Sequence, residues 1–248
     1  MERALISDEL LAERQSRYLG SQGDWDELRS HVTFPSRDQV LELAVQLARP
    51  VPGHIVEFGV YQGRSTRTIR DELWISRLWD RRQRGKRIYA CDSFRGLPTA
   101  YENLPAGNFA TPVPKLAGVR IVEGFFEDSL TPQLAREVGK VSLAHFDADL
   151  ESSTGRALDW LTPLLQPGSV LVFDEFLGEE PGEERAFLEW SRRTGVRTAM
   201  LAMFGREPAG HTDTTDRRAI LQVVGERQIS KAPPLLPRRA RRKLASRW

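Results

Sequence analysis

Short apolar segments alternate with amphipathic segments along most of the chain. Apolar runs that end in polar residues predict buried strands. Such strands are expected at residues 54–59, 87–92, 119–124, 141–147, 169–176, 198–204 and 218–224. Apolar residues at three- and four-residue spacing predict helices. These are expected at residues 3–19, 37–49, 65–79, 132–138, 154–165 and 183–194.

This order of elements predicts an α/β fold. Short apolar strands that alternate with helices are typical of a parallel sheet covered on both faces. The last two strands follow each other across a polar loop, which predicts an antiparallel hairpin at the sheet edge. We therefore expect a Rossmann-like, seven-stranded and mostly parallel sheet. We expect a helical N-terminal cap over residues 1–50, one catalytic or binding domain over 51–228, and a basic tail over 229–248.

Composition and charge narrow the class of protein. The chain has 248 residues, 40% hydrophobic and 28% charged, which is ordinary for a globular protein. No apolar run predicts a membrane span, and the single cysteine excludes an internal disulfide framework. Six of the basic residues lie in residues 238–248, so the rest of the chain is net acidic although the whole carries +2. An acidic body disfavours a nucleic-acid substrate, and we expect a cytoplasmic protein.

The ends of the predicted strands are rich in acids. In an open α/β sheet, ligands bind beyond the carboxyl ends of the strands. Unpaired carboxylates are costly inside a sheet, so a row of them at this edge indicates a ligand site. The acids at or next to strand ends are Glu57, Asp92, Glu123, Asp147, Asp174 and Glu175.

The segment VEFGVYQGRST, residues 56–66, predicts a turn that binds a zwitterion. Gly59 and Gly63 allow a tight turn and close approach of a ligand. Ser65 lies where the next helix should begin, and free N–H groups at a helix start favour an anion. The dinucleotide pattern G-x-G-x-x-G is absent, which disfavours a nicotinamide enzyme. With Asp92 placed to accept from ribose hydroxyls, the expected ligand is S-adenosylmethionine.

A second cluster of carboxylates predicts a hard metal ion. Asp147 ends the fourth strand, Asp149 follows it, and Asp174 and Glu175 end the fifth. Carboxylates that meet at one edge repel each other unless a cation lies among them. Oxygen ligands favour Mg²⁺ or Ca²⁺ over Zn²⁺. Helix capping by Asp149 or Glu175 is the alternative explanation.

Five segments resemble class I S-adenosylmethionine-dependent O-methyltransferases, and more narrowly the macrocin O-methyltransferase (TylF/MycF-like) family, which methylates sugar hydroxyls of natural products. The segments are VEFGVYQGRST, CDSFRGLP (91–98), GFFEDSL (124–130), FDADLESST (146–154) and LQPGSVLVFDEF (165–176). The resemblance implies a methionine site at Glu57, Gly59, Tyr61, Gly63 and Ser65, a ribose site at Asp92 and Ser93, and an adenine site at Phe126 and Glu127. It also implies a metal site at Asp147, Asp174 and Glu175.

The resemblance implies methyl transfer to a hydroxyl. A divalent ion would stabilise the developing alkoxide, and a carboxylate would take the proton. Asp147 or Asp149 is the expected base, whereas His145 is expected to be structural and His211 to lie in an exposed loop. Catechol O-methyltransferases share part of the pattern, but they carry a lysine where this chain has Leu150. The remaining alternatives are a nucleic-acid methyltransferase and a cofactor-binding module without catalysis.

Two further segments are expected near the acceptor. Residues 93–118 form a long loop rich in proline and glycine, and such loops are often functional lids. Residues 34–37 are expected to complete the pocket or an oligomer interface. The expected acceptor is a small glycoside, and a homo-oligomer is typical of the resembling family.

Overall fold

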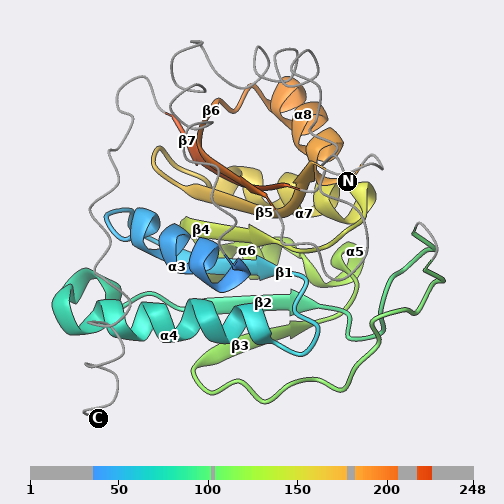
Figure 1. The fold of residues 1–248 in the computed structure, drawn as a ribbon, viewed down its shortest axis with the longest axis horizontal. Helices are drawn as coiled ribbons and strands as arrows, with labels where there is room; N and C mark the ends of the chain where they lie inside the picture. Colours follow the sequence, from blue (N-terminus) through green and yellow to red (C-terminus); the bar gives the residue numbers. More distant parts are fainter. Residues whose placement is uncertain (1–35, 102–103, 178–181, 206–216, 225–248) are drawn as a thin grey trace, which may run out of the picture.

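The computed structural model describes residues 36–101, 104–177, 182–205 and 217–224. The predicted helix at residues 3–19, the loop that contains His211 and the basic tail lie outside these residues. The described part is a seven-stranded sheet with helices on both faces (Figure 1). None of its helices is long and apolar enough to cross a lipid bilayer.

The elements follow the predicted order. The strands are β1 (His54–Phe58), β2 (Ile88–Asp92), β3 (Val119–Glu123), β4 (Val141–Phe146), β5 (Val170–Leu177), β6 (Thr198–Gly205) and β7 (Arg217–Val223). The helices are α3 (Arg37–Ala48), α4 (Arg64–Trp79), α5 (Phe126–Ser129), α6 (Pro132–Val138), α7 (Glu151–Leu161) and α8 (Glu183–Thr194). Two 3-10 turns, η1 (Arg81–Gln83) and η2 (Thr162–Leu164), complete the described set.

The sheet order explains where a ligand can bind. The strands lie in the order β3-β2-β1-β4-β5-β7-β6; β7 runs antiparallel to β5 and β6, and the other neighbouring pairs are parallel. From β1 the chain continues to one side through β2 and β3, and later returns to β4 on the other side. This reversal opens a crevice above the carboxyl ends of β1 and β4. The predicted mostly parallel sheet with a C-terminal hairpin is confirmed.

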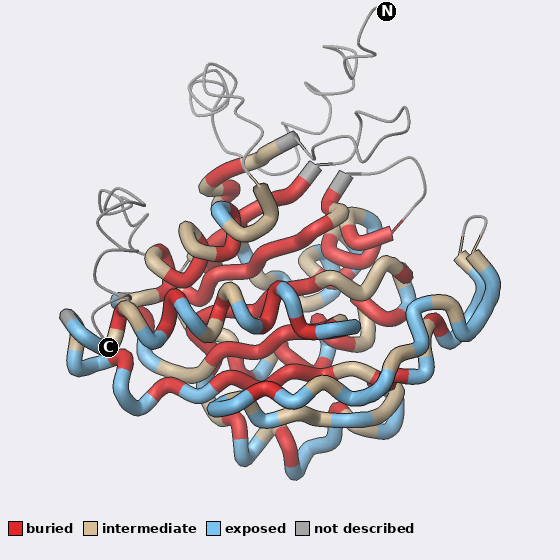
Figure 2. Tube along the Cα trace, turned by 60° about the horizontal axis from the view of Figure 1, so that its bottom comes forward, coloured by how far each residue is buried: buried red, intermediate tan, exposed pale blue. Residues whose placement is uncertain are grey.

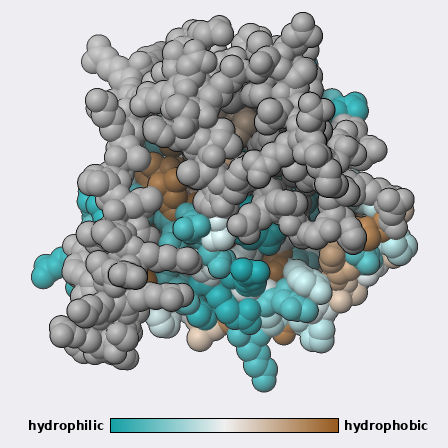
Figure 3. Space-filling view, viewed as in Figure 1, coloured by the Kyte–Doolittle hydropathy of each residue, from teal (hydrophilic) through white to brown (hydrophobic). Residues whose placement is uncertain are grey.

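Alternation along the strands produces two apolar layers. Val56 and Phe58 face a cluster with α5, α6, α7 and α8, whereas Ile55 faces a second cluster with α3 and α4. The strands are therefore buried between helices, as the burial colours in Figure 2 show. On the face viewed in Figure 3, hydrophilic side chains dominate the part that is not grey.

Local signals account for most helix ends. Ser36 caps α3 in a capping box with Gln39, and Thr131 caps α6 just before Pro132. The predicted helix at 154–165 begins earlier, at Glu151, and changes to a 3-10 turn at Thr162. Pro163 explains the change, because proline cannot donate a helical hydrogen bond. The four-residue helix α5 is too short to leave a periodic pattern and was not predicted.

Candidate active site

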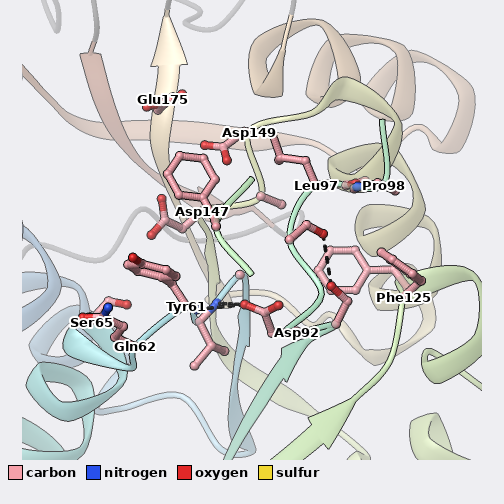
Figure 4. A pocket seen from close by; sticks show the side chains of 18 of the residues that line it. Tyr61, Gln62, Ser65, Asp92, Leu97, Pro98, Phe125, Asp147, Asp149 and Glu175 are labelled. Atoms are coloured by element: carbon pink, nitrogen blue, oxygen red, sulfur yellow. Dashed lines mark hydrogen bonds between the residues drawn. The ribbon is translucent and has the colours of Figure 1, made fainter. Parts of the chain in front are cut away.

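A cavity of about 370 Å³ lies above the carboxyl ends of β1, β2 and β4. The structure places most predicted site residues in its wall: Gly59, Tyr61, Ser65, Asp92, Ser93, Phe126, Glu127, Asp147, Asp149 and Glu175. Glu57, Gly63 and Asp174 lie outside the lining. In Figure 4, Asp147, Asp149 and Glu175 lie toward one end of the cavity, and Asp92 and Phe125 lie nearer the other.

Asp92 shapes the loop that follows β1. One carboxylate oxygen accepts from the backbone N–H groups of Val60 (2.7 Å) and Tyr61 (2.8 Å), and the other accepts from that of Phe94 (2.8 Å). These bonds hold the turn against the end of β2, where Figure 4 shows Asp92 beside the backbone of Tyr61. The carboxylate has about four acceptor sites, so roughly one remains for a ligand. Sequence reasoning placed Asp92 here but missed its role in the loop.

Gly59 lies against the end of β4. Its φ is +88°, and a Cβ atom at this position would lie 1.9 Å from the backbone oxygen of Asp147. The same two strand ends are joined by a bond of 2.9 Å from the N–H of Asp147 to the oxygen of Phe58. Glycine is therefore required for β1 and β4 to end side by side, and this contact brings Asp147 to the cavity.

Glu57 and His145 form a buried pair below the cavity. They are neighbours on adjacent parallel strands, both are fully buried, and Nδ1 of His145 lies 3.0 Å from Oε1 of Glu57. The remaining polar atoms, Oε2 of Glu57 and Nε2 of His145, have no hydrogen-bond partner in the described structure. Glu57 lies outside the cavity lining and its Oε1 faces His145, and contact of its side chain with the cofactor stays a prediction.

Two arginines bind the carboxylates that end β4 and β5. Arg37, at the start of α3, lies 3.0 Å and 3.2 Å from the two oxygens of Asp147. The same guanidinium donates to both oxygens of Asp174, one of them at 3.1 Å. Arg218, on β7, donates to Asp174 at 2.6 Å. The cluster therefore joins one helix and three strands that are far apart in the sequence.

The arginines separate the pKa values of the two aspartates. Burial would raise the pKa of Asp174, but Arg37 and Arg218 outweigh it and lower the pKa to about 2. For Asp147, burial and the nearby Asp174 raise the pKa to about 6, although Arg37 opposes them. Burial likewise would lower the pKa of Arg37, but the two carboxylates raise it above its usual value. Asp174 is therefore a fixed anion, and Asp147 titrates close to neutral pH.

The arrangement does not fit the predicted metal site. All four oxygens of Asp147 and Asp174 already face guanidinium nitrogens. In the described residues, no three His, Cys, Asp or Glu side chains are grouped to hold an ion. The position of Glu175 is set differently, since its backbone N–H donates to the buried Glu183 at 3.0 Å. Neither Arg218 nor Glu183 was predicted: Arg218 lies 44 residues from Asp174, and Glu183 lies in a different element from Glu175, eight residues along the chain.

The loop between β2 and β3 supplies one wall of the cavity. This segment projects beyond the carboxyl end of the sheet (Figure 1), and Leu97, Pro98 and Phe109 line the cavity. The ring of Phe109 packs edge-on against that of Tyr61, with 5.9 Å between centroids. Tyr61 and Phe109 both have positive φ, which is a strained conformation often found at functional sites.

The strand order, the crevice at its reversal point and the acidic residue at the end of β2 define a class I methyltransferase fold. Comparison with known proteins agrees with this assignment of the fold. Residues 56–176, just under half of the chain, match the model of a family described as a methyltransferase domain. Over these residues the chain is therefore similar to methyltransferase domains, in agreement with the predicted fold class.

Individual relatives are also methyltransferases. A curated 8-demethyl-8-(2,3-dimethoxy-alpha-L-rhamnosyl)-tetracenomycin-C 4'-O-methyltransferase of Streptomyces olivaceus is 28% identical over 180 residues, which cover 62% of this chain and 65% of the relative. The solved structure of the calicheamicin methyltransferase CalS11 has a TM-score of 0.57 and 22% identity, covering 89% of this chain and 95% of CalS11. The O-methyltransferase NovP has a TM-score of 0.55 and 19% identity, covering 76% and 80%. The two structures establish the fold.

Proposed function

We propose that the chain is an S-adenosylmethionine-dependent O-methyltransferase that methylates a sugar hydroxyl of a glycosylated natural product. The observation that carries the proposal is that Asp92, the proposed ribose ligand, and Asp147, a carboxylate with a raised pKa, line one cavity. Asp92 lies at the end of β2 and Asp147 at the end of β4, and both line this cavity. Its volume of about 370 Å³ is in the range of small-molecule sites.

The residues of the cavity fit the cofactor. The start of α4 offers free backbone N–H groups to the methionine carboxylate, next to Ser65 and Tyr61. Asp92 has room to accept from one ribose hydroxyl, and Ser93 lies beside it for the other. Phe126 and Glu127 line the part of the cavity assigned to adenine.

The chemistry divides between cofactor and chain. When bound, S-adenosylmethionine supplies an electrophilic methyl group on sulfur for the acceptor oxygen. Asp147 is ionised at pH 7, because its pKa is about 6, and takes the proton of the acceptor hydroxyl. Asp149 also lines the cavity and is the second candidate for this role. The walls hold the acceptor in a fixed approach, which contributes much of the rate gain in such reactions.

The assignment of the acceptor is supported by the relatives. The Streptomyces olivaceus enzyme is named for a rhamnosyl group, and CalS11 is also described as a TDP-rhamnose 3'-O-methyltransferase. A deoxysugar glycoside or its nucleotide-activated form is therefore the proposed substrate class, with a role in antibiotic biosynthesis. Membership of the macrocin O-methyltransferase family, a homo-oligomeric state and a cytoplasmic location belong to the same proposal.

The alternative explanation for activation of the acceptor hydroxyl is the divalent ion predicted from the sequence, which would stabilise the developing alkoxide. Three acidic side chains at the ends of β4 and β5 support it, and the arginine contacts of Asp147 and Asp174 oppose it. No step of the proposed reaction depends on that ion. Titration of the protein with Mn²⁺ tests for that ion.

Calorimetric titration tests the proposed function. We expect S-adenosylmethionine to bind with one site per chain and NAD to give no heat. Mass spectrometry should then detect a gain of one methyl group on TDP-rhamnose or a rhamnosylated polyketide, and none on a catechol. Absence of S-adenosylmethionine binding would overturn the assignment, and methylation of the catechol alone would transfer it to the catechol class.

A further inference from the structure

Asp147 and Asp174 are held together by a guanidinium. Arg37 contacts both oxygens of each carboxylate, with distances of 3.0 and 3.2 Å to Asp147 and 3.1 Å to one oxygen of Asp174. We infer that Arg37 takes the place of a divalent metal ion in this site. Arg37 is thus a positioning residue that holds Asp147 for proton transfer. The inference rests on the proposed function and adds the group that organises its base.

The local charge leaves no demand for a metal ion. The two carboxylates of Asp147 and Asp174 face the two guanidinia of Arg37 and Arg218, so the charges of these four side chains balance. A divalent cation would add two positive charges next to two buried or half-buried cations. Like charges at such distances repel strongly in a partly desolvated site. A metal ion would also need oxygens that now accept from nitrogen.

The placement of Arg37 is built into the fold. Ser36 and Gln39 form a capping box that fixes the start of α3 one residue from Arg37. The apolar face of α3 is buried against the sheet through residues that include Leu41 and Ala44. At its other end, the buried Lys86 donates to the backbone oxygens of Ala48 (2.9 Å) and Val51 (2.7 Å). Both ends of the helix are therefore fixed, and the guanidinium is carried on a rigid element.

Arg37 is also in a position to influence the acceptor. Its side chain is 26% exposed and lines the cavity together with Asp147, whereas Arg218 is only 7% exposed and lies outside the lining. Arg37 thus contacts both carboxylates from the cavity side, whereas Arg218 contacts Asp174 alone, at the Oδ1 atom that also accepts from Nε of Arg37. A planar guanidinium with several donors suits this two-carboxylate bridge, and lysine has no equivalent geometry.

The first test measures metal binding directly. Mn²⁺ is titrated into the full-length protein with S-adenosylmethionine present, and free Mn²⁺ is followed by electron paramagnetic resonance. We expect the signal of free Mn²⁺ to be unchanged by the protein, and protein dialysed against EDTA to keep its full turnover. One tightly bound Mn²⁺ per chain that is lost in Asp174→Asn would overturn the inference, while leaving the proposed methyl transfer intact.

The second test compares arginine variants. Arg37→Gln should lower kcat about 100-fold, the scale expected for a misplaced catalytic group, with the Kd for S-adenosylmethionine unchanged. Arg37→Lys should recover only part of this loss. The matched control is Arg120→Gln, which removes an exposed arginine paired with Glu137 at 3.0 Å, and it should keep wild-type kcat. Wild-type kcat in Arg37→Gln would overturn the inference.

The two tests are separable from the proposed function. If Arg37→Gln fails to fold, the Mn²⁺ titration of the wild-type protein still decides whether a metal occupies the carboxylates. If the wild-type protein methylates only with added Mg²⁺, the function stands and the inference fails. If it binds no S-adenosylmethionine at all, the proposed function fails, and the Mn²⁺ signal still reports on the cation.

Discussion

Replacing Gly59 by alanine should destabilise the protein and disturb its site together. The residue has a φ of +88°, a conformation that alanine rarely adopts. Its new Cβ atom would lie 1.9 Å from the backbone oxygen of Asp147. A backbone atom cannot rotate away as a side chain can, so β1 and β4 must separate at their ends. This movement would displace Asp147 from the cavity.

The expected magnitude combines two costs. A non-glycine residue in the left-handed region costs about 1–2 kcal/mol, and overpacking of a close contact costs about 1–3 kcal/mol. Together they predict a loss of about 2–5 kcal/mol, which lowers the Tm of a domain of this size by about 4–20 °C. The affinity for S-adenosylmethionine should fall as well, because the altered turn forms part of its proposed site.

Thermal and urea unfolding followed by circular dichroism measure this loss. The control is Gly155→Ala, since Gly155 lies inside α7 and its added Cβ would meet no atom within 4 Å. Alanine in a helix interior should stabilise this variant by about 0.5–1 kcal/mol. The glycine-to-alanine change should therefore lower the free energy of unfolding at Gly59 and raise it at Gly155. A Gly59→Ala protein as stable as wild type, with unchanged cofactor affinity, would refute the reasoning.

Three further predictions concern single ionisable groups. Asp92→Ala should weaken S-adenosylmethionine binding more than tenfold in calorimetry, because three backbone N–H groups lose their acceptor, whereas the exposed Asp71→Ala should not. The pKa of Asp147 is raised to about 6 by burial and Asp174, so kcat measured against pH should rise through about pH 6, and a flat profile would exclude Asp147 as the base. Burial lowers the pKa of Lys86 to about 8, so between about pH 8 and 10.5 the unfolded chain binds more protons and the free energy of unfolding should rise with pH. Lys86→Met should remove this pH dependence and lower the free energy of unfolding by about 1–3 kcal/mol, because buried acceptors are left unpaired. A variant with the same pH dependence as wild type would show that Lys86 is not its source.

Much of the fold could be predicted because its signals are local. The strand that begins at His54, the helix that ends at Thr194 and the proline that starts α6 each depend on residues close in sequence. The acids at strand ends could be placed at one edge because parallel strands share their direction. The shared direction of parallel strands is sufficient to predict that Asp92 and Asp147 line the same cavity.

The electrostatics of the site could not be predicted in the same way. Arg37 lies 110 residues from Asp147 and 137 from Asp174, and no spacing in the sequence relates them. In the sequence the strand-end carboxylates have no visible cationic partner, which is why a metal ion was predicted among them. The structure supplies guanidinia from α3 and β7, because helix packing and sheet order bring both to the same edge. The partner of Glu57 could not be predicted for a related reason, since His145 lies on the strand beside it.

The position of β7 has a consequence for how the protein is made. This strand lies between β5 and β6, although it leaves the ribosome after both. Translation delivers only about 5–20 residues per second, so the two earlier strands must wait with exposed edges until residues 217–223 emerge. Arg218 arrives with this insertion, and the anionic pocket is neutralised only when the sheet is closed. A chain stalled before β7 has emerged would expose unpaired backbone groups along the edge of β5. We expect chaperones to bind this edge.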